Sequence, residues 1–277
     1  MKLRFFYDVV CPYAYLASQR VEALAARTGA ELEWCPVLLG GLYNHHGSDQ
    51  VPANGWAAAK VRIGADDMLQ QAAHHNTPLH LNPRHPQRSV EAMRLIISAP
   101  ANARTALSHA IFETYWVQDG DITDAATLDQ LAVRFGIDPQ ARASLEVKQE
   151  LHYRTAEAAD KGAFGVPTFL VGDRVWWGQD RMHFVEEALG GDPQLEPDLS
   201  TNQTPRTITF FHDFSSPFSY LASTQIERIA TQRGATVVWR PILLGALFRT
   251  IGTPDVPLFT MSPAKMRYIQ RDLGDWA

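Results

Sequence analysis

The chain has 277 residues, a formal net charge of -5 at pH 7, and only two cysteines. Its length exceeds that of a usual single domain, so more than one folded unit is expected, and its acidic balance argues against a nucleic-acid partner. No apolar run is long enough for a membrane span, and two cysteines give no disulfide framework, so we expect a cytoplasmic protein with no membrane partner.

The N-terminal segment reads as a strand followed by a helix. The run LRFFYDV, residues 3–9, suits a buried strand and lacks the pattern of a secretory signal. Pro12 is typical of a first helical turn, apolar residues recur at helical spacing over residues 13–27, and Gly29 ends the helix. The run AELEWCPVLL, residues 30–39, indicates a second strand, which predicts a βαβ unit with parallel strands.

The middle of the chain has a helical pattern, with helices predicted at 56–76, 88–98, 102–117, 124–135 and 141–161. The segment from Gly165 to Leu189 then predicts two strands, joined by a turn at Gly172 and Asp173, and a closing helix. The predicted fold class is therefore α/β. It is a thioredoxin-like fold over residues 1–189, with an all-helical domain inserted at about 56–161.

The sequence also repeats itself. Residues 2–72 align with residues 207–277 at a fixed offset of 205 without a gap, and 26 of the 71 pairs are identical, which indicates a duplication. The Pro-rich and Gly-rich stretch between the two copies predicts a linker over 190–206. We expect residues 207–277 to form an incomplete second repeat of the βαβ half. Its open strand edge would pack against the first unit or swap into a partner chain, and a homodimer is expected.

Cys11 falls at the predicted N-terminus of the first helix, where unpaired N–H groups and the helix dipole favour a thiolate. The alternative is a buried small apolar residue. Ala14 occupies the place of a resolving cysteine, and Cys35 is the only other thiol. Asp8 either tunes the proton affinity of the thiol or anchors the backbone of the turn, and Tyr13 packs or contacts substrate. The ten histidines show no zinc-binding spacing, so no metal is expected.

Several motifs together resemble a known family: FFYDVVCPYAYLA, VLLGGLY, YWVQDGDIT, GAFGVPTFLVG and WWGQDRM. They look like the kappa-class glutathione transferases and the 2-hydroxychromene-2-carboxylate isomerases, in the DsbA-like branch of the thioredoxin fold. The resemblance implies glutathione as cofactor and an enzyme, an isomerase or transferase, whose substrate is a small aromatic or unsaturated electrophile. A monothiol oxidoreductase of the DsbA type and a non-catalytic binding module are the alternatives.

The resemblance also implies roles for single residues. Cys11 stands where the family has a serine that supports the glutathione thiolate, whereas Ser216 of the second repeat keeps that serine and is expected to be inactive because its pocket is incomplete. Val166, followed by a cis-Pro167, would pair through its backbone with the cysteinyl part of glutathione.

Four further residues are implied for the two ends of glutathione. Gln179 and Asp180 would lie at the γ-glutamyl end, with Asp180 suited to its ammonium group. Lys60 matches a lysine near the glycyl carboxylate. Ser48 replaces a family asparagine, which departs from the family pattern.

Overall fold

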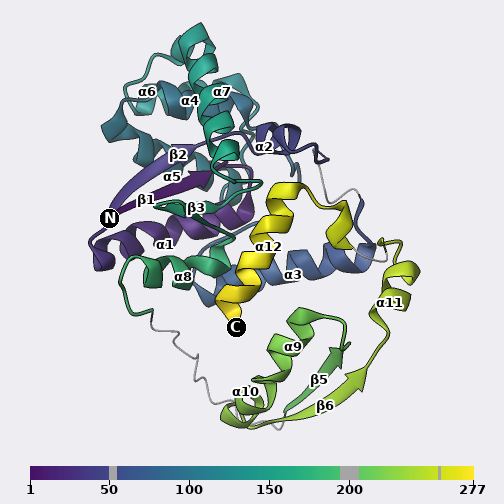
Figure 1. Cartoon of the computed structure of the whole chain (residues 1–277). Coiled ribbons are helices and arrows are strands. Elements are labelled where there is room, and N and C mark those ends of the chain that lie inside the picture. Colours follow the sequence, from purple (N-terminus) through teal and green to yellow (C-terminus); the bar gives the residue numbers. More distant parts are fainter. Residues whose placement is uncertain (50–54, 194–205, 255–256) are drawn as a thin grey trace. The chain divides into compact units, whose positions relative to one another are not determined.

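The computed structural model describes residues 1–49, 55–193, 206–254 and 257–277. The chain divides into two compact units (Figure 1). One comprises residues 1–54 and 58–193, and the other comprises residues 55–57 and 194–277. Most of the predicted linker at 190–206 lies outside the described residues. Among the described helices, none has the length and apolar content of a membrane span.

The first unit is built on a four-stranded sheet with the strand order β2-β1-β3-β4. The strands are β1 (Lys2–Tyr7), β2 (Glu31–Pro36), β3 (Thr168–Val171) and β4 (Arg174–Trp177). β1 and β2 are parallel, with Phe5 opposite Trp34, and β3 is antiparallel to β1, with Phe5 opposite Phe169. The predicted βαβ unit and the predicted hairpin are both present.

Eight α-helices and two short 3-10 helices of the first unit are described: α1 (Pro12–Thr28), α2 (Leu39–His45), α3 (Ala58–His74), α4 (Val90–Ser98), α5 (Ala101–Trp116), α6 (Ala125–Arg134), η2 (Pro139–Ala143), α7 (Leu145–Asp160), η3 (Gln179–Arg181) and α8 (Met182–Ala188). The predicted helices of the insertion agree with α3 to α7 to within four residues at either end. The thioredoxin-like order of elements, with helices inserted between its two halves, is confirmed. The helix α2 was not predicted, because two glycines within LGGLYNH are poor helix formers.

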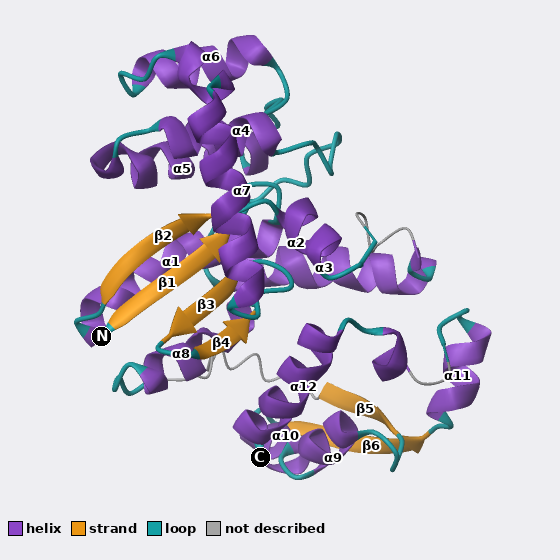
Figure 2. Cartoon of the chain, turned by 45° about the horizontal axis from the view of Figure 1, so that its top comes forward, coloured by secondary structure: helices purple, strands orange, loops and turns teal. Residues whose placement is uncertain are grey.

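The two faces of the sheet are covered by different helices. Figure 2 shows α1 behind the sheet and α7 in front of it. On the α1 side, Phe5 stacks on Tyr7 and Phe169, with ring centroids 5.3 and 5.5 Å apart, and the edge of Trp34 packs on Phe5 at 5.1 Å. This aromatic cluster forms the centre of the core.

On the α7 side of the sheet, an ion pair joins a strand to a helix. Both terminal nitrogens of the Arg4 guanidinium donate to the Glu157 carboxylate, at 2.8 and 2.9 Å. Paired hydrogen bonds of this kind fix both distance and orientation. The ion pair therefore locks α7 to β1.

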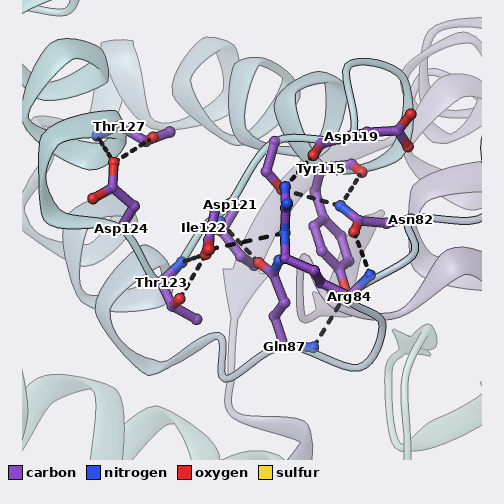
Figure 3. Close-up of polar contacts among 11 residues, drawn as sticks. Asn82, Arg84, Gln87, Tyr115, Asp119, Asp121, Ile122, Thr123, Asp124 and Thr127 are labelled. Carbon is purple, nitrogen blue, oxygen red and sulfur yellow. Dashed lines mark hydrogen bonds and ion pairs between the residues drawn. The ribbon is translucent and has the colours of Figure 1, made fainter.

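A polar network holds together two loops of the insertion (Figure 3). The Asn82 side-chain amide donates to the carbonyls of Tyr115 and Gly120, at 3.1 and 3.0 Å. The Gln87 side-chain oxygen accepts from the Ile122 N–H at 2.9 Å. These bonds attach the segment that leads into α4 to the loop between α5 and α6.

The described elements of the second unit are β5 (Arg206–His212), α9 (Pro217–Ser223), α10 (Ile226–Gln232), β6 (Ala235–Pro241), α11 (Leu244–Thr250), η4 (Pro257–Thr260) and α12 (Pro263–Trp276). β5 and β6 are parallel, with Phe210 opposite Trp239, a register that lies 205 residues on from Phe5 and Trp34. The carboxylate of Asp213 accepts from the Leu244 N–H at 2.7 Å, and that of Asp8 accepts from the equivalent Leu39 N–H at 2.9 Å. That this unit is an incomplete repeat stays a prediction.

Candidate functional site

Cys11 is the N-cap residue of α1, directly after the turn that follows β1. Its N–H donates to the Asp8 carbonyl at 3.1 Å, and its carbonyl accepts from the Tyr15 N–H at 3.0 Å. Pro12 occupies the first helical turn, where its fixed φ angle suits the helix and no N–H is needed. The sequence thus places the Cys11 thiol at the helix N-terminus, where it is buried.

The thiol of Cys11 faces the peptide group ahead of Pro167. Its Sγ donates to the Val166 carbonyl oxygen at 3.2 Å, and the Val166–Pro167 bond is cis. In the part of the chain that the structure describes, no group accepts a hydrogen bond from the Val166 N–H. Residues 155 positions apart thus meet at a buried peptide group whose N–H has no acceptor among the described residues.

The segment before Val166 is held by close packing. A Cβ atom at Gly165 would lie 2.8 Å from the indole nitrogen of Trp177, so only glycine fits there without a shift. On the other side, the Pro167 carbonyl accepts from the Gly178 N–H at 3.0 Å. The peptide that faces Cys11 is therefore fixed from both ends.

The charge state of Cys11 differs from the sequence-based expectation. Burial raises the pKa of the Cys11 thiol to about 12, although the backbone N–H groups of Ala14 and Tyr13 lower it, and the nearby Asp8 carboxylate raises it further. The expectation of a thiolate is therefore wrong, because desolvation outweighs the helix N-terminus. At neutral pH this residue is a protonated hydrogen-bond donor.

Asp8 lies beneath the same turn and is buried. Its carboxylate accepts hydrogen bonds from the Val10 N–H at 3.2 Å, the Leu39 N–H at 2.9 Å and the Ser89 hydroxyl at 2.9 Å. Burial raises the pKa of Asp8 to about 6, and the three donors oppose this rise. Asp8 thus anchors the turn to α2 and α4, and its charge also acts on the thiol, so the two roles considered for it are combined.

Gln179 is buried in a polar cluster. Its side-chain oxygen accepts from the Arg20 guanidinium of α1, and its amide donates to the Gln71 side chain of α3 at 3.1 Å. Burial lowers the pKa of Arg20 to about 10. Arg20 and Gln71 were not predicted as site residues. The one signal for Arg20 in the sequence is that a charged residue lies on the helix face that also carries the buried Leu16 and Leu24.

The remaining predicted residues of the first unit are less buried. Asp180 is exposed and pairs with the adjacent Arg181. The Tyr13 hydroxyl donates a hydrogen bond to the Asp67 carboxylate of α3 at 3.2 Å, a partner that was not predicted.

Lys60 lies exposed in the first turn of α3, and Ser48 is exposed beyond α2. The structure therefore does not place these two residues among the buried groups around Cys11.

Ser216, the counterpart of Cys11 in the second unit, caps α9. Its hydroxyl accepts from the Ser219 N–H at 3.2 Å, whereas Cys11 makes no side-chain cap on α1. Ser216 thus acts as an ordinary helix cap, and the described second unit has no strand hairpin opposite it.

A separate hollow of about 180 Å³ lies between α2, α4 and α7 in the first unit. It is lined by Leu38, Gly41, Arg94, Lys148, Leu151, His152 and Thr155. No cluster of three His, Cys, Asp or Glu side chains suited to a metal ion occurs within the described ranges. The convergent groups of the candidate site are therefore those around Cys11 and Val166.

A strand, a helix N-terminus that bears a cysteine, and a cis-proline hairpin opposite it define a protein of the thioredoxin class. The sequence model of the "DSBA-like thioredoxin domain" matches residues 2–190 and 207–277. The chain belongs to this family, as the sequence motifs indicated.

Three comparisons illustrate its relatives. A 2-hydroxychromene-2-carboxylate isomerase of Pseudomonas putida is 27% identical over 73% of this chain and all of its own length. Glutathione S-transferase kappa 1 of Rattus norvegicus is 27% identical over 68% of this chain and 90% of its own. A solved structure of a 2-hydroxychromene-2-carboxylate isomerase superposes with a TM-score of 0.61 and 23% identity, over 69% of this chain and 95% of that one.

Proposed function

We propose that the chain is a glutathione-dependent isomerase or transferase that acts on a small aromatic or unsaturated electrophile. The observation that carries this proposal is the meeting of the Cys11 thiol and the Val166 peptide ahead of cis-Pro167, 3.2 Å apart. The relatives that bear isomerase and transferase names are consistent with it. Cytoplasmic location and a homodimer remain predictions.

The backbone at Val166 suits a tripeptide. Its N–H has no acceptor within the described structure, and an extended peptide laid along it would supply a carbonyl oxygen. Gln179 and Asp180, close in sequence beyond the hairpin, would bind the γ-glutamyl end in exchange for their present partners in the protein. These groups support glutathione as the proposed cofactor.

Bound glutathione would supply a thiol sulfur as the nucleophile. Cys11 then acts as a hydrogen-bond donor, because its raised pKa keeps the proton on its own sulfur, and its S–H turns from the Val166 carbonyl to the glutathione sulfur. A protonated donor stabilises a neighbouring thiolate, whereas an ionised Cys11 would repel it. The backbone N–H groups of Tyr13 and Ala14, at the start of α1, add to the same positive field.

The thiol-disulfide alternative has less support. Exchange needs a thiolate, and burial raises the pKa of both Cys11 and Cys35 to about 12. The two thiols are free, and the Cys35 Sγ lies 3.6 Å from the Glu33 carbonyl, its own hydrogen-bond acceptor on β2. Ala14 stands where a resolving cysteine would lie, and the Cys35 thiol is buried and bonded to its own strand.

The test combines calorimetry with kinetics. We expect glutathione to bind the intact chain, and we expect turnover of 2-hydroxychromene-2-carboxylate or of an aromatic electrophile such as chlorodinitrobenzene. Cys11→Ser keeps a donor and should hold kcat/KM within about tenfold, whereas Cys11→Ala should lose about 100-fold or more. Equal loss in both variants would support the thiol-exchange alternative, and binding without turnover of any electrophile would support a binding module.

A further inference from the structure

The hollow of about 180 Å³ between α2, α4 and α7 includes none of the residues assigned to the proposed function. Figure 2 shows α7 beside both α2 and α4, and α7 packs against each of them. Positions 148, 151, 152 and 155 of α7 line the hollow, and this helical spacing places them on one face over about 10 Å of the helix axis. The hollow therefore extends along that face of α7.

The part of the hollow next to α2 is apolar. Leu38, which precedes α2, and the buried Leu151 of α7 both line it. The Thr155 hydroxyl accepts from the Leu38 N–H at 3.0 Å and donates to the Leu151 carbonyl at 2.7 Å, so its polar atom is already used within the protein. A cavity of about 150 Å³ with an apolar lining binds benzene, so the space here suits one six-membered aromatic ring.

Basic side chains complete the lining of the hollow. Lys148 and His152 are exposed and lie one turn apart on α7, and Arg94 is contributed by α4. Arg94 pairs with Glu91 at 2.5 Å, whereas within the described ranges the side chains of Lys148 and His152 form no hydrogen bond or ion pair. Among the described residues, no acidic side chain lines the hollow. The positive charge of Lys148 is therefore left for an anion from outside the chain.

We propose that this hollow binds a small aromatic carboxylate, with its ring against Leu38 and Leu151 and its carboxylate facing Lys148 and Arg94. The ring of such a ligand leaves water for an apolar surface, and its charge meets the ammonium group of Lys148, so both parts of the molecule favour binding. A cation would be repelled by the two basic side chains, and a neutral aromatic molecule would leave the charge of Lys148 unmatched. The site does not include Cys11 or Val166, so its occupation does not depend on glutathione.

The test is a titration of the full chain with sodium benzoate, followed by nuclear magnetic resonance. Benzoate should saturate one site in the wild type, and Lys148→Gln should raise its dissociation constant by about fivefold, the effect of losing a partly exposed ion pair. Lys161→Gln is the matched control and should leave the dissociation constant unchanged, because Lys161 is an exposed lysine at the end of the same helix that does not line the hollow. Benzyl alcohol, which has the same ring without the charge, should bind more weakly, and equally in the wild type and in Lys148→Gln.

Three results would overturn the proposal. The first is that benzoate does not bind the wild-type chain in a saturable way. The second is that the dissociation constant of benzoate is the same in wild type and Lys148→Gln, or that both lysine variants weaken binding equally, since the site would then lie elsewhere. The third is that glutathione displaces benzoate, which would place the ligand beside Cys11 and not in the hollow. Far-UV circular dichroism checks that both variants fold.

Discussion

The buried carboxylate of Asp8 should make the stability of the first unit depend on pH. Its pKa is about 6 in the folded protein, against an ordinary value of 3.8. Because the folded-state pKa is the higher one, the folded chain holds a proton that the unfolded chain has released, and stability falls as pH rises from about 4 to about 6. The two pKa values correspond to a loss of about 3 kcal/mol, complete near pH 7.

Asp8→Asn removes this titration. The amide leaves at least one of the donors without an acceptor, and this lost hydrogen bond contributes a pH-independent loss of about 1–3 kcal/mol to the free energy of unfolding. The difference between variant and wild type should therefore change by about 3 kcal/mol between pH 4 and pH 7, in favour of the variant at the higher pH. Urea unfolding of both proteins across this range measures the change.

Asp213→Asn is the matched control in the second unit. The Leu244 and Ser215 backbone N–H groups lower the pKa of Asp213, so the effect of that substitution should depend on pH in the opposite direction. If the curves of stability against pH for wild type and Asp8→Asn ran parallel, the buried charge inferred for Asp8 would be wrong.

Two further predictions concern the neighbourhood of the site. Trp116→Phe should lower the free energy of unfolding by about 2–3 kcal/mol in urea denaturation, since the indole N–H of this fully buried residue donates to the Val9 carbonyl at 2.9 Å; an unchanged midpoint would contradict that role. Iodoacetamide at pH 7.5 should label Cys11 and Cys35 slowly in the native chain and rapidly in urea, because burial keeps both thiols protonated; rapid labelling of the native protein would count against this.

Local signals accounted for much of the fold. The start of α1 at Pro12 and its end at Gly29, which has a φ of 64°, follow from the properties of these two residues. The hairpin turn at Gly172 likewise has a positive φ, which glycine adopts without strain. Each of these features depends on a few neighbouring residues, which is why the sequence alone predicted them.

The side chains around the candidate site, by contrast, are brought together from distant parts of the sequence, so local patterns did not predict them. The cluster of Arg20, Gln71 and Gln179 joins three elements, and no spacing within one segment indicates it. The protonation of Cys11 was predicted wrongly because the helix N-terminus is a local property, whereas burial results from the packing of the whole unit. Such properties arise only from the packing of distant segments against one another.

The helix α7 connects the inserted helices mechanically to the candidate site. It runs from the inserted helices to the segment just before Val166, and its Glu157 is clamped to Arg4 of the sheet. A helix of 16 residues is stiff along its length, so α7 moves as a rigid body about its ion pair with Arg4. A tilt of α7 about this ion pair would therefore displace the segment before Val166, whose carbonyl oxygen lies 3.2 Å from the Cys11 thiol.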